Sequence, residues 1–301
     1  MVKIIDIQFL GVKSAIACFL IKSSKGLIMI ETGPSTSYNI ISQELTNLGY
    51  NIKDVKHVFV THIHLDHSGG AWKFAKNGAK IYVHPCGAQH LENPQKLIES
   101  ATKIYGDKMD FLWGKIQKID KKKIQTVEHK EKIIIGNYEW EIVVGSGHCP
   151  DHICLFNEEL KLFISGDQVL PKITSNVSVF PTEPKSNPLK DWLESCKYIK
   201  KRVPNDVLVL PSHNEPFRGL HERLDHLING HEKNLSRLLD FCEEPNVGRG
   251  LAVGDLNNDG KLDMVISSIG APTKILYGNN RETNNWIIIS ATDPQKGNRI
   301  D

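Results

Sequence analysis

The chain has 301 residues and a mass of 33.9 kDa, so it can bury a large core as one large domain or two smaller ones. Hydrophobic residues make up 40% of the chain, charged residues make up 24%, and the formal net charge is +2. These proportions are those of a globular protein, and the near-neutral charge argues against a strong general attraction to nucleic acid or membranes.

The N-terminus and the cysteines indicate where such a protein works. Residues Met1–Asp6 include charged side chains and open no long apolar run, so we expect no signal peptide. No run reaches the roughly 18 apolar residues of a membrane span. The six cysteines contain no Cys-x-x-Cys pair, which favours reduced thiols over a disulfide framework. We therefore expect a cytoplasmic protein without a membrane segment, and the sequence leaves its oligomeric state open.

The first third of the chain alternates predicted strands and helices. Apolar, β-branched runs predict the strands, and Ser23–Gly26 is typical of a hairpin turn between the first two. Apolar residues at helical spacing predict the helices, the first of which closes at Gly49. In chain order we expect strands at residues 15–21, 26–31, 56–61 and 80–84, and helices at residues 37–48 and 71–76.

The motif Thr61–Gly70 follows an apolar run and packs three histidines and one aspartate into six positions. Side chains two apart point the same way in an extended chain, so His62, His64 and Asp66 would share one side. His67 would face elsewhere, which lets one segment serve two ions. The glycines that end the motif would let the chain turn tightly into the next helix. Imidazole and carboxylate are the usual ligands of zinc and similar ions, so a metal site is favoured over a histidine-rich surface loop.

Residues 87–118 carry apolar side chains at helical spacing, with charged residues between them. We expect helices in this stretch. They would either form one wall of a substrate pocket or simply pack against the sheet, and the sequence favours neither alternative.

The middle of the chain again contains short apolar runs, and three of them lead into a residue able to bind a metal ion. These residues are His148, Asp167 and His213. Ligands on strand ends gather at one edge of a sheet and are held rigidly there. In chain order we expect strands at residues 132–136, 139–144, 153–156 and 161–165, and helices at residues 188–202 and 220–242.

The stretch 167–187 is rich in turn residues and starts at Asp167, so we expect it to lie over the site. Gln168, Lys172 and Asn176 are candidate substrate contacts. A solvated loop is the alternative for each of the three.

Taken in order, these motifs resemble those of the metallo-β-lactamase-fold superfamily, and the resemblance covers about residues 2–242. It implies an α/β fold of the αββα sandwich type. Within the superfamily, the motifs look most like the glyoxalase II-like branch near the hydroxyacylglutathione hydrolases. The turn Glu31–Gly33 stands where the family usually has Asp-x-Gly. The resemblance implies that this acid supports the site and does not bind metal.

The resemblance also implies two metal positions, here called the first and the second ligand set. The implied cofactors are two zinc ions, with iron or manganese as alternatives. By the same resemblance, His152 looks structural. The first ligand set is His62, His64 and His148, the second is Asp66, His67 and His213, and Asp167 bridges both.

The chemistry follows from such a pair of ions. Two cations about 3.5–4 Å apart lower the pKa of a bound water, so hydroxide is available near neutral pH to attack a carbonyl carbon or a phosphorus. The cations also polarise the electrophile and hold the developing oxyanion. Asp66 is the candidate catalytic residue, because it could orient the hydroxide as well as bind metal. We therefore expect a dinuclear metal-dependent hydrolase that acts on an ester, thioester or lactone carbonyl of a small molecule.

Three other activities remain as alternatives. An endoribonuclease or phosphodiesterase would contact RNA phosphates with Lys121–Lys123 and Lys200–Arg202, although such basic runs are also typical of solvated faces. A mononuclear iron persulfide dioxygenase would use only His62, His148 and Asp167. A β-lactamase shares the implied fold, but a fold alone does not confer that activity.

Cys149 directly follows the candidate ligand His148. It is either a redox-sensitive thiol that perturbs the metal or a small residue in a tight loop. The second interpretation is favoured.

The last sixty residues change character after Glu243–Asn246, where a proline and turn residues indicate a boundary. We expect a catalytic domain at residues 1–242 and a small, β-rich, incomplete appendage at residues 246–301. The apolar runs 250–253 and 264–266 predict a strand–loop–strand unit in this appendage.

The loop of this unit has oxygen ligands at alternate positions and a glycine for a sharp turn, which suits a hard cation such as calcium. The unit resembles one FG-GAP repeat, and residues 284–301 resemble the start of an ASPIC/UnbV module. Because a single repeat cannot bury its faces alone, we expect the appendage to be incomplete. The candidate calcium ligands are Asp255, Asn257, Asp259, Lys261 and Asp263.

Overall fold

The computed structural model describes residues 2–179, 186–243, 247–254, 256, 263–269 and 274–276. The chain divides into two units, residues 1–229 and residues 230–301, and the division falls inside the long helix α8 (Leu220–Glu243). The domain boundary expected at residues 243–246 stays a prediction.

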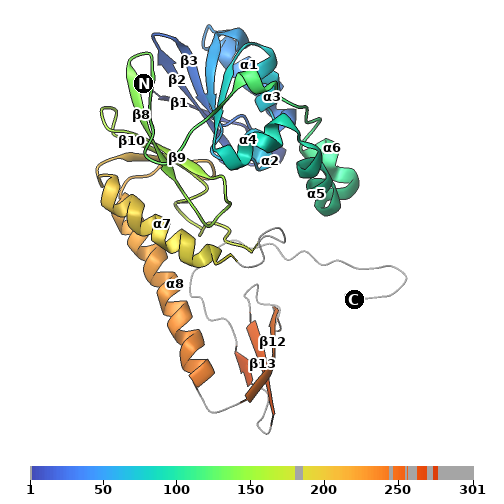
Figure 1. Ribbon diagram of the computed structural model, residues 1–301, viewed down its shortest axis with the longest axis vertical. Coiled ribbons are helices and arrows are strands. Elements are labelled where there is room, and N and C mark those ends of the chain that lie inside the picture. Colours follow the sequence, from blue (N-terminus) through green and yellow to red (C-terminus); the bar gives the residue numbers. More distant parts are fainter. Residues whose placement is uncertain are drawn as a thin grey trace. The chain divides into compact units, whose positions relative to one another are not determined.

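Six strands form the first sheet, in the order β1–β2–β3–β4–β5–β6. The strands β1 to β3 pair antiparallel, and β3 to β6 pair parallel. Helices occupy the connections between the parallel strands, as a parallel pairing requires (Figure 1). The strands are β1 (Val2–Asp6), β2 (Ala17–Ser23), β3 (Gly26–Ile30), β4 (Val55–Phe59), β5 (Lys80–Val83) and β6 (Ile124–Thr126).

Five strands form the second sheet, in the order β11–β10–β9–β8–β7. The pair β10–β11 is parallel and the other pairs are antiparallel. As a result, β8, β10 and β11 run in the same direction and end at the same edge. The strands are β7 (Lys132–Ile135), β8 (Tyr138–Val144), β9 (Ile153–Asn157), β10 (Leu162–Gly166) and β11 (Leu208–Pro211).

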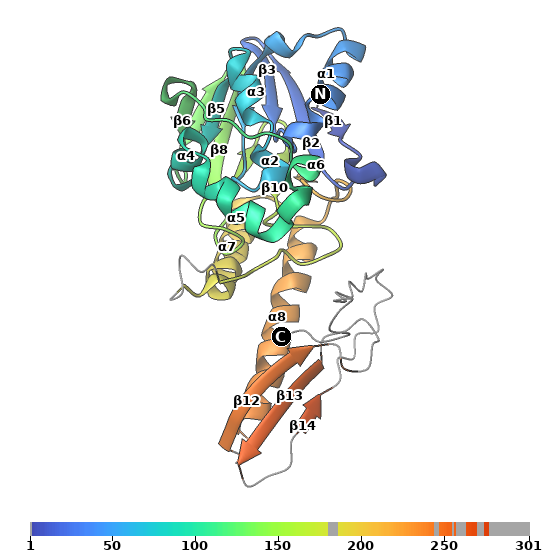
Figure 2. The same cartoon turned by 90° about the vertical axis from the view of Figure 1, so that its right-hand side faces the viewer.

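The two sheets lie face to face, and helices cover their outer faces (Figures 1 and 2). One apolar cluster fills the space between the sheets, and two others lie between a sheet and its helices. The alternation along β2 shows how one strand serves two clusters. Phe19 belongs to the cluster between the sheets, whereas Leu20 belongs to the cluster under the helices. This order of layers confirms the expected αββα sandwich.

Helices α1, α3 and α4 pack on the first sheet, and α7 and the beginning of α8 pack on the second. The observed bounds of α3 and α7 coincide with the helices expected at 71–76 and 188–202. Among the described residues, no helix combines the length and the apolar character needed to cross a membrane. The helices of the first unit before α8 are α1 (Tyr38–Asn47), α2 (Leu65–Ser68), α3 (Ala71–Lys76), α4 (Pro85–Glu92), α5 (Gln95–Tyr105), α6 (Met109–Leu112) and α7 (Pro188–Arg202), with 3-10 turns η1 (Phe9–Gly11), η2 (Ser35–Ser37), η3 (Ile52–Asp54), η4 (Gly106–Lys108) and η5 (Lys121–Lys123).

The stretch 87–118 contains most of α4 and all of α5 and α6, so the helices expected there are present up to Leu112. The helix α4 contributes to the cluster on the first sheet. In contrast, α5 and α6 form a small separate cluster with Trp113 and with Leu65 of α2. They therefore pack on the helix that carries part of the first metal motif.

In the second unit, three antiparallel strands form a separate sheet in the order β12–β13–β14. The strands are β12 (Val247–Gly254), β13 (Asp263–Ile269) and β14 (Lys274–Leu276), so the predicted strand–loop–strand pairing is present. Asp263 is buried and accepts a hydrogen bond from the Leu256 amide at 2.8 Å. The FG-GAP and ASPIC/UnbV resemblances stay predictions. The other candidate calcium ligands, Asp255, Asn257, Asp259 and Lys261, lie outside the described residues, as does the stretch 284–301.

Candidate metal centre

Four strand ends carry the seven predicted metal ligands. The first motif follows β4 of the first sheet, and His148, Asp167 and His213 follow β8, β10 and β11 of the second. Because these three strands of the second sheet run in the same direction, their ends lie at one edge of the sandwich. The structure brings all seven side chains together at this edge.

The first motif does not stay extended as far as expected. The strand β4 ends at Phe59, and the helix α2 begins at Leu65, so Asp66 and His67 lie on a helical turn. The prediction that the side chains of His62, His64 and Asp66 lie on the same side of an extended segment is therefore wrong. The amides of residues 67 and 68 both donate to the His64 carbonyl, which starts the turn there. As a result, His62 Nε2 contacts His64 Nδ1 in the first set, and Asp66 Oδ2 contacts His67 Nε2 in the second.

Three imidazole nitrogens form a triangle in the first ligand set. His62 Nε2 lies 2.9 Å from His64 Nδ1, His148 Nε2 lies 3.1 Å from His64 Nδ1, and the two Nε2 atoms are 3.3 Å apart. Two ligands about 2.0–2.1 Å from a tetrahedral zinc ion lie about 3.3 Å from each other. The triangle therefore has nearly the size of one face of a zinc tetrahedron.

The second ligand set closes a ring with the predicted bridge. Asp66 Oδ2 lies 3.4 Å from His67 Nε2 and 3.5 Å from His213 Nε2. Asp167 Oδ1 lies 3.6 Å and 3.3 Å from the same two nitrogens. The other oxygen of Asp167, Oδ2, lies 3.7 Å from His148 Nε2 of the first set. One carboxylate therefore reaches both sets.

Two buried polar atoms in this ring have no hydrogen-bond partner among the described residues: His67 Nε2 and Asp167 Oδ1. An unpaired buried polar atom is costly, so such atoms need a partner that the protein itself does not supply. A cation between them would fill that need. Imidazole nitrogens and carboxylate oxygens at these spacings fit zinc or a similar divalent ion.

Electrostatics differ between the two sets. Burial and the neighbouring imidazole of His67 hold the pKa of His62 well below its usual 6.5. Burial and the imidazole of His148 lower the pKa of His64 to about 4. Both imidazoles are therefore neutral at pH 7 and keep a lone pair for a cation.

In the second set, the carboxylates raise the pKa values of the histidines instead of letting burial lower them. Burial alone would lower the pKa of His67, but the charges of Asp66, Asp167 and Glu31 raise it well above 6.5. Burial is likewise overcome at His213, where the close carboxylates of Asp167 and Asp66 raise the pKa to about 10. The same imidazoles hold the pKa values of both aspartates below the usual range, against the effect of burial.

Glu31 supports the site, as the family resemblance implies. Its Oε1 lies 3.2 Å from His67 Nδ1 and accepts hydrogen bonds from the hydroxyls of Thr61 and Ser212. The Thr61 hydroxyl lies 2.9 Å from His62 Nδ1, so one buried carboxylate orients a histidine of each set. Glu31 has a φ of 64°, a left-handed conformation that side chains rarely adopt. Such strain is typical of functional sites.

Backbone carbonyls orient two further ligands. His148 Nδ1 hydrogen-bonds the Asn176 carbonyl at 2.8 Å, and His213 Nδ1 hydrogen-bonds the Ala15 carbonyl. Both histidines then present Nε2 to the site. Sequence reasoning missed these carbonyls and Thr61, because a backbone oxygen leaves no signature in the residue type that carries it.

The glycines of the first motif serve a purpose other than the expected tight turn. Gly69 and Gly70 both have negative φ values, −56° and −87°, which any residue can adopt. A side chain on Gly70 would place its Cβ 2.9 Å from the Thr32 carbonyl, and one on Gly69 would lie 3.1 Å from Pro34. Thr32 in turn donates from its amide and its hydroxyl to the His67 carbonyl. The glycines therefore allow the turn that carries Glu31 to approach α2.

The loop that carries His148 is tied to the first motif by its own side chains. Asp151 Oδ2 accepts a hydrogen bond from the Ile63 amide at 2.9 Å, and the Cys149 thiol forms a hydrogen bond with the same carboxyl group. Burial and this acid raise the pKa of the Cys149 thiol well above its usual value. His152 Nε2 accepts a hydrogen bond from the Asp167 amide at 3.0 Å. Cys149 and His152 therefore hold the loop in place, which agrees with the structural roles favoured for them from the sequence.

The candidate substrate contacts on the stretch 167–179 differ in exposure. Gln168 is buried, and its Nε2 donates to the Ser146 carbonyl at 3.1 Å, so it fixes the loop and does not face solvent. Lys172 and Asn176 have exposed side chains. Tyr105 of α5 is close enough to the second set for the charge of Asp66 to add to burial in raising the pKa of its phenol.

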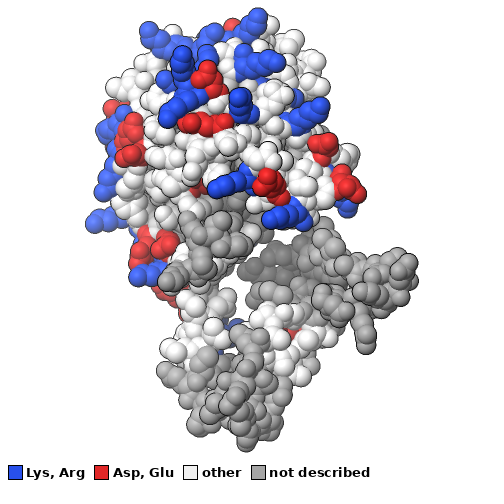
Figure 3. All heavy atoms as spheres, turned by 45° about the vertical axis from the view of Figure 1, so that its right-hand side comes forward, with Lys and Arg blue, Asp and Glu red and all other residues white. Residues whose placement is uncertain are grey.

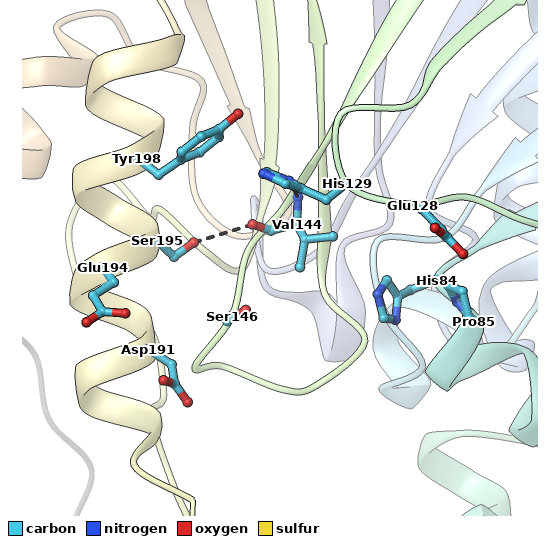
Figure 4. A pocket seen from close by; sticks show the side chains of 10 residues that line it. All are labelled: His84, Pro85, Glu128, His129, Val144, Ser146, Asp191, Glu194, Ser195 and Tyr198. Carbon is cyan, nitrogen blue, oxygen red and sulfur yellow. Dashed lines mark hydrogen bonds between the residues drawn. The ribbon is translucent and has the colours of Figure 1, made fainter.

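A hollow of about 680 Å³ lies apart from the ligands and includes none of the seven (Figure 4). Asp191, Glu194 and Tyr198 of α7 line one side, and His84 and His129 lie across from them. Its size alone does not make it the catalytic site, because the ligands gather elsewhere.

The four-layer fold and the two linked ligand sets define a class of proteins that hold metal ions at one edge of an αββα sandwich. The model of the metallo-beta-lactamase superfamily matches residues 12–213, and the chain belongs to this superfamily. The match ends at His213, the last of the seven predicted ligands. The assignment of these ligands to metal ions stays a prediction.

Named relatives agree with this family. The chain is 24% identical over 244 residues to the probable metallo-hydrolase YqjP of Bacillus subtilis (strain 168), a match that covers 74% of this chain and 75% of that protein. It is 28% identical over 188 residues to a metallo-beta-lactamase fold-containing protein of Sulfurisphaera tokodaii, covering 60% of this chain and 66% of that protein. A solved beta-lactamase domain protein from Burkholderia ambifaria matches with a TM-score of 0.62 at 27% identity and covers 77% of this chain and 74% of that chain.

Proposed function

We propose that this chain is a dinuclear metal-dependent hydrolase that cleaves an ester, thioester or lactone carbonyl of a small molecule. One observation carries the proposal: Asp167 turns one carboxylate oxygen to each ligand set. Its Oδ1 lies 3.3 Å from His213 Nε2 of the second set, and its Oδ2 lies 3.7 Å from His148 Nε2 of the first. Membership of the superfamily and the similarity to a probable metallo-hydrolase support the same class of reaction.

The residues of the site would divide the work. When bound, two divalent ions would lower the pKa of a water and polarise the carbonyl. We propose zinc, because three imidazoles suit it, and iron or manganese are the alternatives. Asp66 turns Oδ2 toward His67 and His213, so its other oxygen would accept a hydrogen bond from the attacking water and orient it.

The charges on the face that Figure 3 shows favour a small molecule over RNA as the substrate. On the face that Figure 3 shows, acidic side chains lie among the basic ones, and the basic side chains are more numerous toward the top. A nucleic-acid groove would instead carry a continuous basic surface. The glyoxalase II-like branch stays our finer proposal for the position of the chain within the superfamily.

Metal content and a substrate panel test the proposal together. We expect about two zinc ions per chain by elemental mass spectrometry on protein purified without added metal. The protein should hydrolyse at least one of a panel of esters, thioesters and lactones, and treatment with a chelator should abolish this activity until zinc is restored. The variant His64→Ala should lose the ion of the first set and the activity while keeping its circular dichroism spectrum. A single iron per chain, or activity that survives the loss of metal, would contradict the proposal.

A further inference from the structure

Exposed apolar side chains are concentrated on three chain segments that contact residues of the metal centre. Among the described residues of the first unit, seven large apolar side chains are more than half exposed, and six of them belong to three segments that border the predicted ligands. Scattered exposed apolar side chains are ordinary, but a gathering at one place indicates a binding surface. These six, here called the apolar rim, are Leu10, Val12, Ile104, Phe111, Ile173 and Val179, and the seventh is Ile134 on β7.

Two of the three segments touch a ligand through their backbone. The segment that carries Leu10 and Val12 ends at Ala15, whose carbonyl accepts the hydrogen bond of His213 Nδ1. The segment that carries Ile173 and Val179 begins at the predicted bridge Asp167, and its Asn176 carbonyl hydrogen-bonds His148 Nδ1 at 2.8 Å. Both pairs of rim residues are therefore a few residues along the chain from an atom that orients a metal ligand.

The third segment is α5 with α6, which packs on the first motif. Trp113 stacks on Phe9 at 5.4 Å between ring centroids and meets Tyr105 edge-on at 5.1 Å. These rings cluster with Leu65, which stands between the predicted ligands His64 and Asp66 in the sequence. Phe9 directly precedes Leu10, so this aromatic cluster joins two of the segments that carry the rim.

The backbone at Leu10 is a second, independent sign of function. Its φ is 54°, in the left-handed region that a leucine rarely adopts, and 61% of the residue is exposed. Neither the strain nor the exposure of an apolar side chain stabilises the fold. Strained residues that persist are typical of binding and catalytic sites.

We propose that the apolar rim binds the hydrocarbon part of an acyl substrate whose carbonyl lies at the metal centre, so that the enzyme prefers medium- and long-chain acyl esters, thioesters or lactones. This inference rests on the proposed hydrolase function. In the reaction, the oxygen of water bonds to the acyl carbon and the bond from that carbon to the leaving oxygen or sulfur breaks. The proton of the water ends on the leaving group, and nothing is oxidised or reduced.

The arrangement of the rim favours a substrate over a membrane or a second copy of the chain. Its residues come from three short segments that each border a predicted ligand, and the charged residues Lys13, Asp107 and Lys108 are exposed within or between these segments. An apolar chain that extends from a polar carbonyl matches a polar centre with apolar surroundings. A membrane or protein contact needs no such relation to the ligands.

A chain-length series tests the rim. The substrates are 4-nitrophenyl esters from butanoate to decanoate, and the enzyme is the zinc-loaded full chain. We expect kcat/KM to rise about twofold per added methylene, which is half of the free energy of complete burial. The variant Ile104→Gln/Phe111→Gln should lower kcat/KM for decanoate about tenfold and change it less than twofold for butanoate, because only the long chain reaches the rim.

The chain offers a matched control. Ile134 is an isoleucine of nearly the same exposure as Ile104, 72% against 76%, but it lies on the edge strand β7. Ile134→Gln should leave the whole series unchanged. If the double variant fails to fold by circular dichroism, Leu10→Asn replaces it, since asparagine tolerates the left-handed conformation. Equal chain-length slopes in the rim variant and the control would overturn the rim and leave the hydrolase function intact.

Binding of the acid itself separates the two proposals. Isothermal titration calorimetry would compare sodium decanoate with sodium butanoate on the zinc-loaded protein. If no ester is hydrolysed but the double variant binds decanoate about tenfold more weakly, the hydrolase function fails and the rim stands. If decanoate binding is equal in both proteins, the rim fails. A change in phosphatidylcholine-vesicle binding or in sedimentation mass, with decanoate binding unchanged, would overturn the inference in favour of a membrane or a second copy.

Discussion

The two ligand sets lie side by side, yet they are built from different chemistry. The first consists of three imidazoles, and burial together with neighbouring imidazoles keeps His62 and His64 neutral. The second places His67 and His213 between carboxylates, which raise the pKa values of both imidazoles. The first set therefore presents lone pairs that are ready for a cation, whereas the second holds protons that a cation must displace. Two adjacent sites in one fold can thus differ in how they take up metal.

The supporting contacts differ in the same way. In the first set, His148 is oriented by a backbone carbonyl and His62 by the Thr61 hydroxyl, both of which are neutral groups. In the second set, His213 is also oriented by a backbone carbonyl, that of Ala15, but His67 is oriented by the carboxylate of Glu31. An anion behind an imidazole strengthens its hold on a cation, so the second set depends more on its support than the first.

The largest effect should come from the residue that both sets share. Asp167→Ala removes Oδ1 from the second set and Oδ2 from the first, so we expect metal content to fall below one ion per chain. Activity should fall more than about a hundredfold, beyond the 10–100-fold range of residues that only orient a ligand. Elemental mass spectrometry and steady-state kinetics on the same preparation measure both.

Two single-set variants provide the comparison. His64→Ala touches only the first set, and His213→Ala touches only the second and its bridge. Each should retain close to one ion. If Asp167→Ala retains as much metal as these two variants, the carboxylate does not bridge the sets.

A smaller effect is expected from Glu31→Gln, which keeps the shape of the side chain and removes its charge. The second set should lose about 10- to 100-fold in metal affinity, because His67 loses its anionic partner. The first set should lose less, since only Thr61 relays the change to His62. Competition with a zinc chelator of known affinity resolves the two binding steps. Equal losses at both steps would show that Glu31 does not distinguish the sets.

The α/β alternation followed from the sequence because apolar alternation and helical spacing are local signals, whereas the αββα order of layers followed from the family resemblance. The helices at 71–76 and 188–202 were predicted with their observed bounds, and the segments that carry the seven predicted ligands meet at one edge of the sandwich. The geometry within the first motif was not predicted, because the alternation of an extended chain was continued into α2. A helical turn of only four residues is too short to show its own periodicity.

The surroundings of the ligands were less predictable for a related reason. The carbonyls of Ala15 and Asn176 orient histidines far away in the chain. The residue type of an alanine or an asparagine does not indicate what its backbone carbonyl contacts. Gly69 and Gly70 were recognised, but the need for them comes from a second segment that approaches α2, not from their own backbone angles. Long-range contacts of this kind depend on the tertiary fold.

The difference in protonation predicts a pH effect at the second set alone. His213, with a pKa of about 10, and His67 are protonated at pH 7, so a cation that binds there should release about two protons. Its affinity should rise with pH until about pH 10. His62 and His64 of the first set should release almost none, because both imidazoles are already neutral. Zinc titration by calorimetry in two buffers of different ionisation enthalpy counts the protons at each step.

The same shift has a consequence for the metal-free fold, with the opposite sign. A raised imidazole pKa adds stability that is complete below the unfolded value of about 6.5 and is lost as pH rises toward 10. Chelator-treated protein should therefore lose stability to urea between these pH values, whereas zinc-loaded protein should not. If proton release were equal at both binding steps, the contrast between the sets would not hold.

The smallest effect tests whether the first set has three ligands or four. Cys149 Sγ belongs to a group with His62 and His148 whose atoms all lie within 4.8 Å of one another, so a fourth ligand is sterically available. However, the thiol bonds to Asp151, and burial keeps its pKa well above the usual value, so it favours the protonated form that does not bind zinc. Cys149→Ser keeps a hydrogen-bond donor for Asp151. We therefore expect unchanged zinc content, and activity within about twofold of the unmodified protein, since a mild substitution changes a free energy by about 0.5 kcal/mol or less. His148→Ala, one position away, should lose the metal of the first set. If Cys149→Ser loses zinc to a similar extent, the thiol is a ligand, and the first set would then hold an anion as the second does.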